Sequence, residues 1–553
     1  MARIGRILPS FLLMVLLAGC EPVDLRNFIE QLSEPDVAVY VCEATGNDAN
    51  LGDIGAPLKT IQAGIVKAAS FIAEGLTDST RVNVAEGTYQ VTDGKENSAD
   101  YTEGDYINMV EGVSLYGGYA PDFSVRDPSQ YISLIVDMSE QGEDSAAVRA
   151  YDGLTDATVI DGFTIQGAES TDLTSSTTLD IEGASPRVSN NIIRGGYAAV
   201  GGFSLNLDIY DNSAPTIENN TIIGGDALGN TYGIIVAGSS HPVISGNTIS
   251  GGSSFQTNGI LCWESQADIM ENTISGGEGT QTHGINLLSG SMVTIKNNII
   301  DGGTATERST GIYNHSDNNV NIVGNTISGG TSQAGAVGIR NENTGWFSIR
   351  NNLVFGGTAG GTSDADGIFC HDASGGIYNN TIAGGVSDYS TAIVMRVNSS
   401  PSIENNILFS VSAGSGGCCI GESYGGDYPN NKYADTIRNN ALWDPDDAVN
   451  IILYKDYVDD YYDTATDVNN HPHGHTDGNV DTDPLFVDID GPDGDITTMA
   501  DNDWHLSASS PAGIRTGGLD GIAEGWAFTD DRDGNTRTGN GSTGWSIGAY
   551  EQD

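Results

Sequence analysis

Short runs of branched aliphatic residues, separated by asparagine and by pairs of glycine, repeat along most of the chain. The segment Asn-x-Ile-x-Gly-Gly, or a close variant of it, recurs every 25 to 34 residues. Its asparagines are Asn191, Asn220, Asn247, Asn272, Asn298, Asn325, Asn352, Asn380, Asn406 and Asn440. Self-similarity at such a period is the signature of a solenoid, in which each repeat stacks on the next.

Three columns of large aliphatic residues accompany these asparagines. One column stands three residues before each Asn, a second stands two residues after it, and a third follows a glycine as Gly-Ile, from Ile234 to Ile368. Three short strands per repeat cannot each bury one face alone, but coiling them stacks like residues and buries all three columns in one core. The pattern therefore predicts an all-β protein, a parallel β-helix of about ten or more rungs.

The asparagine column has a structural interpretation. Stacked side-chain amides can form hydrogen bonds along the axis of a coil, and Asn tolerates a left-handed corner. We therefore expect these asparagines to be structural and not catalytic.

The ends of the chain differ from the repeats. An amphipathic stretch from Pro57 to Ala73 predicts one helix that caps the open end of the core, as a solenoid requires. The expected organisation is a signal peptide (1–20), a tether (21–36), a cap with the first rungs (37–135), the β-helix repeats (136–445) and an acidic region that closes the coil (446–553).

The N-terminus indicates export. Arg3 and Arg6 precede an apolar run that ends in Leu17-Ala18-Gly19-Cys20, too short to span a bilayer. The final Cys20 resembles the lipobox cysteine of bacterial lipoproteins, which is acylated; a chance cysteine in a plain signal peptide is the alternative. We expect an exported protein at the outer membrane or cell surface, with the N-terminal lipid as its only membrane contact.

The composition of the chain restricts the classes of partner that it can bind. The chain has 553 residues, of which 74 are Gly, and its 22 basic and 74 acidic residues give a net charge of −52. A field of that sign repels nucleic acid and anionic lipid headgroups and disfavours a polyuronate ligand. The acidity suits either high-salt surroundings or divalent cations, and both interpretations stay open.

Both ends of the mature chain resemble a known family. The strings VYVC (39–42), PLKTIQ (57–62) and VAEGTY (84–89), with DPLF (483–486) and IGAYE (547–551), resemble bacterial right-handed parallel β-helix proteins of the pectate-lyase-like superfamily. This resemblance implies a right-handed coil that is exported and attached to the surface. It does not imply one activity, because the superfamily includes lyases, glycosidases, epimerases and binding proteins. The W-x-D-H, R-x-P-x-x-R and G-H-G motifs of pectate lyases and polygalacturonases do not occur.

One strip of outward positions contains aromatic and charged residues. Strand alternation after each Gly-Ile places the first and third following residues outward, on rungs ~4.8 Å apart. The expected substrate-binding residues are Trp263, Tyr313, Arg340, Phe369 and Arg396, and the candidate catalytic residues are His315, Arg340, Glu342, His371 and Asp372. Aromatic faces beside mixed charges suit sugar rings. A solvated ladder of stacked charges is the structural alternative.

Two reactions compete if this strip is catalytic. A uronate lyase would use Arg340 to neutralise the sugar carboxylate, with His315, His371 or Tyr313 as the base. A glycoside hydrolase would need two carboxylates, for which Glu342 and Asp372 are the candidate pair. Neither reaction requires a cofactor.

Metal and cysteine chemistry is weakly indicated. Four aspartates around two glycines offer oxygen ligands for Ca²⁺, although a solvated acidic turn explains them equally: Asp488, Asp490, Asp493 and Asp495. His471, His473 and His475 lie in a Pro/Gly loop, where a metal site is the less favoured interpretation. Five cysteines remain besides Cys20, and we expect free thiols; Cys262 and Cys370 should lie four rungs apart, too far to pair.

Three functions remain open from the sequence. The favoured one is a lipid-anchored β-helix that binds a surface or environmental polysaccharide. A polysaccharide lyase or glycoside hydrolase on the outward strand face is the enzymatic alternative, and a structural or adhesive surface protein without glycan binding is the third.

Overall fold

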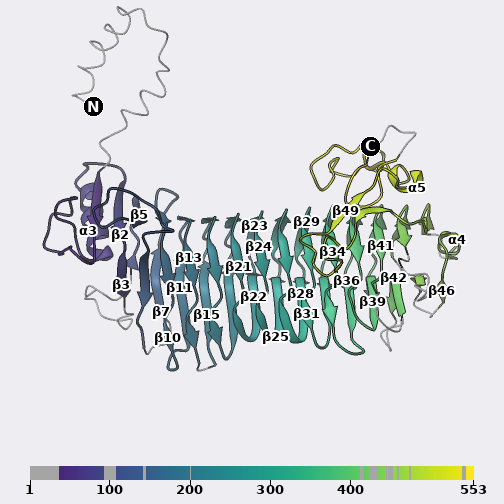
Figure 1. Ribbon diagram of the computed structural model, residues 1–553, viewed down its shortest axis with the longest axis horizontal. Coiled ribbons are helices and arrows are strands. Elements are labelled where there is room, and N and C mark those ends of the chain that lie inside the picture. Colours follow the sequence, from purple (N-terminus) through teal and green to yellow (C-terminus); the bar gives the residue numbers. More distant parts are fainter. Residues whose placement is uncertain are drawn as a thin grey trace, which may run out of the picture.

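A coil of parallel strands forms the body of the computed structural model. The structure describes residues 37–91, 107–140, 145–199, 201–411, 416–423, 434–443, 445, 452–456, 460–472, 475–538 and 544–552. Within these residues, three long sheets of 15, 13 and 19 strands run along the coil, and one strand of each sheet recurs in almost every turn (Figure 1). The predicted parallel β-helix is confirmed.

The 15-stranded sheet carries the aliphatic column that precedes each ladder asparagine. Its strands are β1 (Ala38–Val41), β2 (Thr80–Ala85), β5 (Val113–Tyr119), β8 (Val159–Asp161), β12 (Arg187–Ser189), β16 (Thr216–Glu218), β20 (Val243–Ser245), β23 (Gln266–Met270), β26 (Met292–Lys296), β29 (Asn319–Val323), β33 (Trp346–Arg350), β37 (Gly375–Tyr378), β40 (Ser402–Glu404), β43 (Thr436–Arg438) and β47 (Thr476–Asp477).

The 13-stranded sheet carries the column that follows each ladder asparagine. Its strands are β3 (Gly87–Val91), β6 (Ser133–Asp137), β9 (Thr164–Gln166), β13 (Ile192–Arg194), β17 (Thr221–Ile223), β21 (Thr248–Ser250), β24 (Thr273–Ser275), β27 (Ile299–Asp301), β30 (Thr326–Ser328), β34 (Leu353–Phe355), β38 (Thr381–Ala383), β41 (Ile407–Phe409) and β44 (Ala441–Trp443).

The 19-stranded sheet carries the Gly-Ile column. Its strands are β4 (Ile107–Asn108), β7 (Ser145–Tyr151), β10 (Glu169–Ser170), β11 (Ser175–Glu182), β14 (Tyr197–Ala198), β15 (Phe203–Tyr210), β18 (Asp226–Ala227), β19 (Asn230–Val236), β22 (Ser253–Trp263), β25 (Glu278–Leu288), β28 (Thr304–His315), β31 (Thr331–Ser332), β32 (Ala336–Glu342), β35 (Thr358–Ala359), β36 (Asp364–His371), β39 (Tyr389–Arg396), β42 (Gly416–Ser423), β45 (Ile452–Lys455) and β46 (Tyr461–Tyr462).

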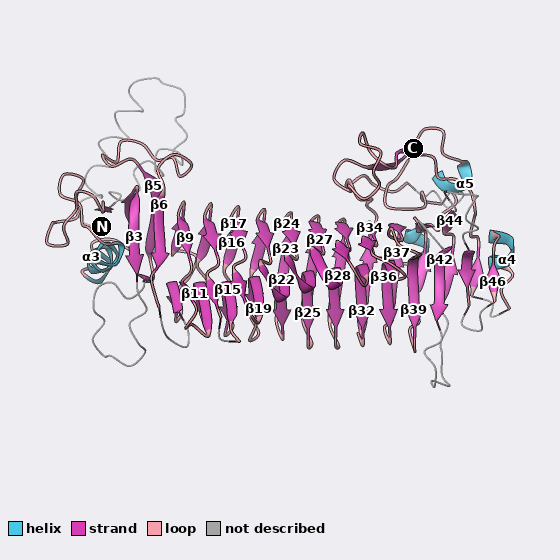
Figure 2. Cartoon of the chain, turned by 60° about the horizontal axis from the view of Figure 1, so that its bottom comes forward, coloured by secondary structure: helices cyan, strands magenta, loops and turns pink. Residues whose placement is uncertain are grey.

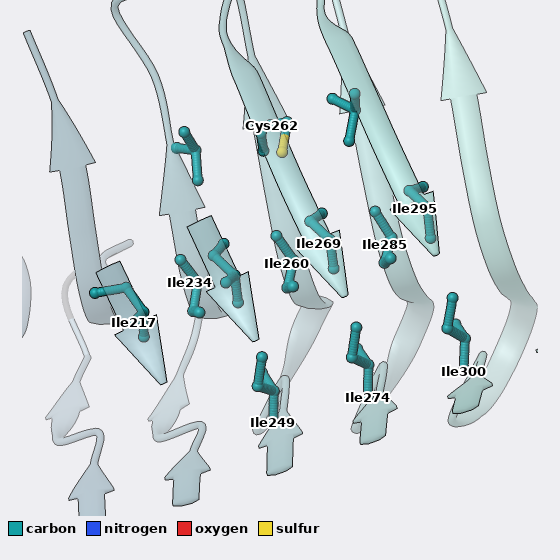
Figure 3. Close-up of a cluster of buried hydrophobic side chains, with 14 of the residues drawn as sticks. Ile217, Ile234, Ile249, Ile260, Cys262, Ile269, Ile274, Ile285, Ile295 and Ile300 are labelled. Atoms are coloured by element: carbon teal, nitrogen blue, oxygen red, sulfur yellow. The ribbon is translucent and has the colours of Figure 1, made fainter. Parts of the chain in front are cut away.

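The three aliphatic columns meet in one core. Ile217, Ile222 and Ile234, one from each sheet, are all buried, and each pairs with the equivalent isoleucine of the next rung. Figure 3 shows these columns directed into a common interior. Stacking like on like therefore buries side chains that a single turn would leave exposed.

The asparagine ladder is a continuous hydrogen-bonded column. The Nδ2 group of Asn298 donates to Oδ1 of Asn325 at 3.0 Å, and the backbone N–H of Asn298 donates to the same oxygen at 2.8 Å. This arrangement repeats from Asn191 onward and extends one rung beyond the predicted repeats, to Asn479. The left-handed backbone, however, belongs to the residue before each ladder asparagine, such as Asn297 or Asn351, so the corner falls one residue earlier than expected.

A helix covers the N-terminal end of the coil. Helix α3 (Ile61–Ala73) begins at the cap residue Thr60, whose side chain accepts a hydrogen bond from the N–H of Ala63. It buries Ile61 and Ile65 in the main core. The predicted capping helix is therefore present.

The coil runs past residue 445, where the sequence repeats end. Strand β42 pairs with β45, and β43 pairs with β47, with helix α4 (Ala465–Asn469) beside them. The following residues fold back along the outer face of the 13-stranded sheet (Figures 1 and 2). This segment contains the antiparallel pair β48 (Phe486–Asp488) and β49 (Asp503–Leu506) and the helices α5 (Ala512–Arg515) and α6 (Gly521–Glu524).

A second core and a buried arginine hold this segment against the coil. Trp504 and Ile547 pack with Phe355 and Phe409 of the 13-stranded sheet. The fully buried Arg537 donates to Oδ1 of Asn351 at 3.0 Å and to backbone carbonyls of its own segment. The C-terminal region thus covers one side of the coil rather than only its end.

Candidate functional site

The predicted strip lies on the outer face of the 19-stranded sheet. Pairing of β28 with β32 and of β32 with β36 places Tyr313, Arg340 and Phe369 side by side. The third outward column aligns His315, Glu342, His371 and Arg396 in the same way. The register thus brings most of the predicted residues together.

The centre of this strip is a closed network of contacts. The Tyr313 hydroxyl donates to Oε2 of Glu342 at 2.7 Å, and Arg340 forms an ion pair with the same carboxylate. Burial acts to raise the pKa of Glu342, but Arg340 and the Tyr313 hydroxyl outweigh it and hold that pKa below its usual value. The Arg340 guanidinium also lies 4.5 Å from the centre of the Phe369 ring. These groups are largely satisfied by one another, which leaves little free for a ligand.

A buried histidine supports the network from the neighbouring rung. The His283 ring stacks on Tyr313 at 5.2 Å. Burial, with help from Arg308 and Arg340, lowers the pKa of His283 to about 3, so it is neutral. His315 lies on the other side of Tyr313, at 5.6 Å between ring centres, and its Nδ1 is 2.6 Å from Oγ of Ser316. Both histidines therefore help to position Tyr313.

Two predicted residues lie apart from the network. Trp263 is 49% exposed and lies two rungs from His315, on β22. Asp372 lies beyond the end of β36 in a left-handed corner, and His371 is the residue that pairs with Glu342. The structure therefore does not make Glu342 and Asp372 a facing carboxylate pair, because Asp372 turns into the corner.

The glycine of each Gly-Ile interrupts the alternation of inward and outward side chains along its strand. A Cβ atom on Gly284 would lie 2.6 Å from the carbonyl oxygen of Gly311, so only glycine fits there. The residue before this glycine shares the outer face with the residue after the Ile, since His283 stacks on Tyr313 and Asn286 bonds to Asn258. Strict alternation places this position inward, so sequence reasoning missed a whole outward column.

A cavity of about 310 Å³ opens on this face, at the C-terminal end of the strip. Strands β36, β39, β42 and β45 form its floor. Its wall includes the missed residues Asp364 and Asp366, and also Tyr389, Arg396, Lys455 and Tyr461. Of the predicted binding residues, Arg396 alone lies in this wall. Charged residues one and three positions before the glycine were the signal in the sequence.

The two aspartates of the cavity differ in environment. Asp364 is half exposed and lies 3.7 Å from the Arg396 guanidinium. Asp366 is only 4% exposed and forms no hydrogen bond or ion pair with any residue that the structure describes. Burial raises the pKa of Asp366 to about 8, and the neighbouring Asp364 adds to this, while Arg396 and Arg340 oppose it. The carboxyl of Asp366 is thus largely protonated at neutral pH.

The expected metal ligands do not gather into a site. In the described part of the chain, no group of three or more His, Cys, Asp or Glu side chains is placed to hold a metal ion. Among the four aspartates, Asp493 and Asp495 accept hydrogen bonds from the turn itself. His471 packs between Tyr454 and Tyr462, 3.5 Å from Asp456, and His473 lies outside the described residues.

The thiols are buried and unpaired with one another. Cys42, Cys262, Cys370, Cys418 and Cys419 are all free cysteines. Cys262 and Cys370 occupy the same inward column, four rungs apart, as predicted. Cys20 lies outside the described residues, and none of the described helices is long and apolar enough to cross a membrane.

Comparison with known families decides the hand of the coil. Residues 258–442 match the family model described as a right handed beta helix region. The coil is a right-handed parallel β-helix. Residues 44–260 match a second model, a protein of unknown function (DUF1565). No curated protein sequence matches the chain.

Several solved structures are similar to parts of this chain. Pectate lyase Pel9A aligns over 95% of this chain and 98% of its own, with 13% identity and a TM-score of 0.36. The Dettilon tailspike protein (gp208) aligns over 66% of each chain, with 12% identity and a TM-score of 0.36. The GH136 lacto-N-biosidase from Eubacterium ramulus aligns over 74% of this chain and 67% of its own, with 11% identity and a TM-score of 0.31. Similarity at this level does not assign a substrate.

Proposed function

We propose that this protein is an exported, lipid-anchored β-helix that binds a neutral polysaccharide on the outer face of its 19-stranded sheet. The observation that carries the proposal is the cavity of about 310 Å³ between β36 and β45. Its volume is at the lower end of the ~300–1,000 Å³ range of small-molecule pockets, which suits about one or two monosaccharide units.

The cavity combines the two kinds of group that bind sugars. Tyr389 and Tyr461 line it and are 50% and 55% exposed, so both rings offer apolar area to the C–H faces of a sugar, although Lys455 Nζ lies 5.7 Å from the centre of the Tyr461 ring. Asp364, Arg396 and Lys455 add hydrogen-bonding groups for hydroxyls. The floor spans three rung steps, or about 14 Å, which accommodates a short stretch of a longer chain.

Removal of one cavity aromatic tests this proposal. Tyr389→Ala should weaken binding to neutral polysaccharides by about fivefold or more, because the ring supplies exposed contact area. Phe255→Ala is the matched control, since Phe255 is 57% exposed on β22 and does not line the cavity. Affinity electrophoresis against xylan, mannan, β-glucan and galactan measures both. Absence of binding to every neutral polysaccharide would favour a structural or adhesive surface protein.

A glycoside hydrolase is the second candidate function. Asp364 and Asp366 lie two residues apart on β36 and both line the cavity. Their Cβ atoms are therefore ~6.7 Å apart, and the carboxyl groups of inverting hydrolases lie ~6.5–9.5 Å apart. Release of new reducing ends from a neutral polysaccharide, lost in Asp364→Asn, would establish this activity. A lyase is less favoured, because the −52 charge of the chain repels polyuronates.

A further inference from the structure

The cavity wall contains a buried carboxyl, that of Asp366. Among the described residues, the Asp366 carboxyl forms neither a hydrogen bond nor an ion pair, although Asp366 is only 4% exposed. Buried polar groups are almost always hydrogen-bonded, and an unpaired one needs an explanation. Here the group lines a cavity large enough for a ligand, which supplies that explanation.

We propose that Asp366 is the ligand-recognition group of this cavity and that it donates a hydrogen bond to a hydroxyl of a neutral sugar. This inference rests on the proposed function, since it concerns the same cavity. It assigns the group that recognises the ligand and makes binding dependent on pH.

The charges around Asp366 support a neutral ligand. The basic residues that face the cavity are Arg396 on β39 and Lys455 on β45, and Arg340 on β32 acts on Asp366 from the strip. The other titratable residues are Asp364 on β36, Tyr389 on β39, Cys418 and Glu422 on β42 and Tyr461 on β46. When Asp366 is neutral, the two positive charges of Arg396 and Lys455 are balanced by the two negative charges of Asp364 and Glu422. The wall therefore offers no net charge to an ionic ligand.

The sign of the pH dependence follows from desolvation. A sugar that covers Asp366 removes its remaining water, which penalises the ionised carboxylate more than the neutral acid. The ligand therefore prefers the protonated form, whose pKa is about 8. Cys418 does not titrate in this range, because burial raises its pKa to about 12. If only the protonated form binds, about 90% of the binding-competent protein is lost at pH 9.

Calorimetric titration of the full chain with neutral oligosaccharides at pH 6 and pH 9 tests this inference. The probes are xylo-, manno-, cello- and galacto-oligosaccharides, with oligogalacturonate as the acidic comparison. We expect about tenfold weaker binding at pH 9 than at pH 6, and proton uptake from the buffer on binding near pH 8.

Variants separate the role of Asp366 from a general effect of pH. Asp366→Asn keeps the size and neutrality of the acid, so its binding should persist and change less than twofold between pH 6 and pH 9. Asp268→Asn removes a carboxylate from β23 on the 15-stranded sheet and should keep the tenfold pH effect. Circular dichroism of each variant establishes that it is folded.

The possible results distinguish a failure of the role of Asp366 from a failure of the proposed function. Neutral-sugar binding that is equal at pH 6 and pH 9, or a tenfold pH effect that survives in Asp366→Asn, overturns the role of Asp366 and leaves the proposed function standing. Preference for oligogalacturonate overturns the neutral class of ligand. Absence of binding to any probe at pH 6 overturns both proposals.

Discussion

Asp366 differs from Glu342, another carboxylate of the outer face, because no described residue forms a hydrogen bond or ion pair with its carboxyl. Glu342 is less deeply buried, with a side chain that is 16% exposed, and an arginine and a tyrosine hydroxyl satisfy it and keep its pKa low. Asp366 has only the more distant charges of Arg396 and Arg340 in its favour, and its pKa rises to about 8. Two acidic residues on adjacent strands of one sheet thus reach opposite protonation states at neutral pH.

Asp366→Asn should remove a pH-dependent loss of stability. The folded protein keeps a proton that the unfolded chain releases above about pH 4, so wild-type stability falls as the pH rises from ~4 to ~8 and then levels off. The amide does not titrate. The free energy of unfolding of the variant, relative to wild type, should therefore rise by at most about 4 kcal/mol between pH 5 and pH 8, measured by chemical denaturation.

The wild-type protein at each pH is the reference, because the difference cancels the titration of all other groups. Parallel stability profiles for the two proteins would show that Asp366 is ionised in the folded state. Such a result would also remove the basis for pH-dependent sugar binding.

At the level of single residues, the sequence predicts the strip but not the cavity beside it. Tyr313, Arg340 and Phe369 were correctly placed on adjacent rungs, because the Gly-Ile repeat fixes the register of the strand that follows it. Their mutual bonding was not predictable, since it depends on rotamers and on His283 beneath Tyr313. Asp364 and Asp366 were missed because the close approach at each Gly interrupts the two-residue period that the prediction assumed.

At the scale of the strand and the rung, the repeat specifies the structure almost completely. Each aliphatic column became the inward face of one sheet, and each repeated Asn became one step of the ladder. The rungs after Asn440 were not predictable in the same way, because residues 441–478 separate the last two ladder asparagines, Asn440 and Asn479, and the spacing rises to 39. The path of the C-terminal segment was equally hidden, since its contacts join residues more than 100 positions apart.

Two alanine substitutions should distinguish a core position from a surface position by their cost in stability, Ile322→Ala in the core and Trp263→Ala on the surface. Ile322 is fully buried on β29, so truncation leaves a cavity and should cost ~2–5 kcal/mol. Trp263 is 49% exposed and packs on no core cluster, so its truncation should cost less than about 1 kcal/mol. Thermal and chemical unfolding of both variants measures the difference. Equal losses would mean that the outward column on β22 faces the core.

At the scale of the whole molecule, the coil separates its two ends. Helix α3 closes the N-terminal end, and strands β36, β39 and β42 lie toward the other end (Figure 1). These strands contribute residues to the cavity. About eleven rung steps lie between β1 and β37, the neighbour of β36 in the chain, which corresponds to ~50 Å. A lipid at Cys20 would therefore hold the N-terminal cap near the membrane and leave the cavity well away from it.

Cys20→Ser should release the protein from membranes without changing its fold or its ligand. A cysteine thiol is the acceptor for the lipid of a bacterial lipoprotein, and serine does not replace it, so the variant should lose its acyl chains. Cys20 precedes the first described strand by 17 residues, so the unfolding midpoint and the affinity for a neutral polysaccharide should match wild type. Detergent phase partitioning measures the anchor, and mass spectrometry of the mature N-terminus measures acylation. Retention of the variant in the detergent phase would mean that another part of the chain binds the membrane.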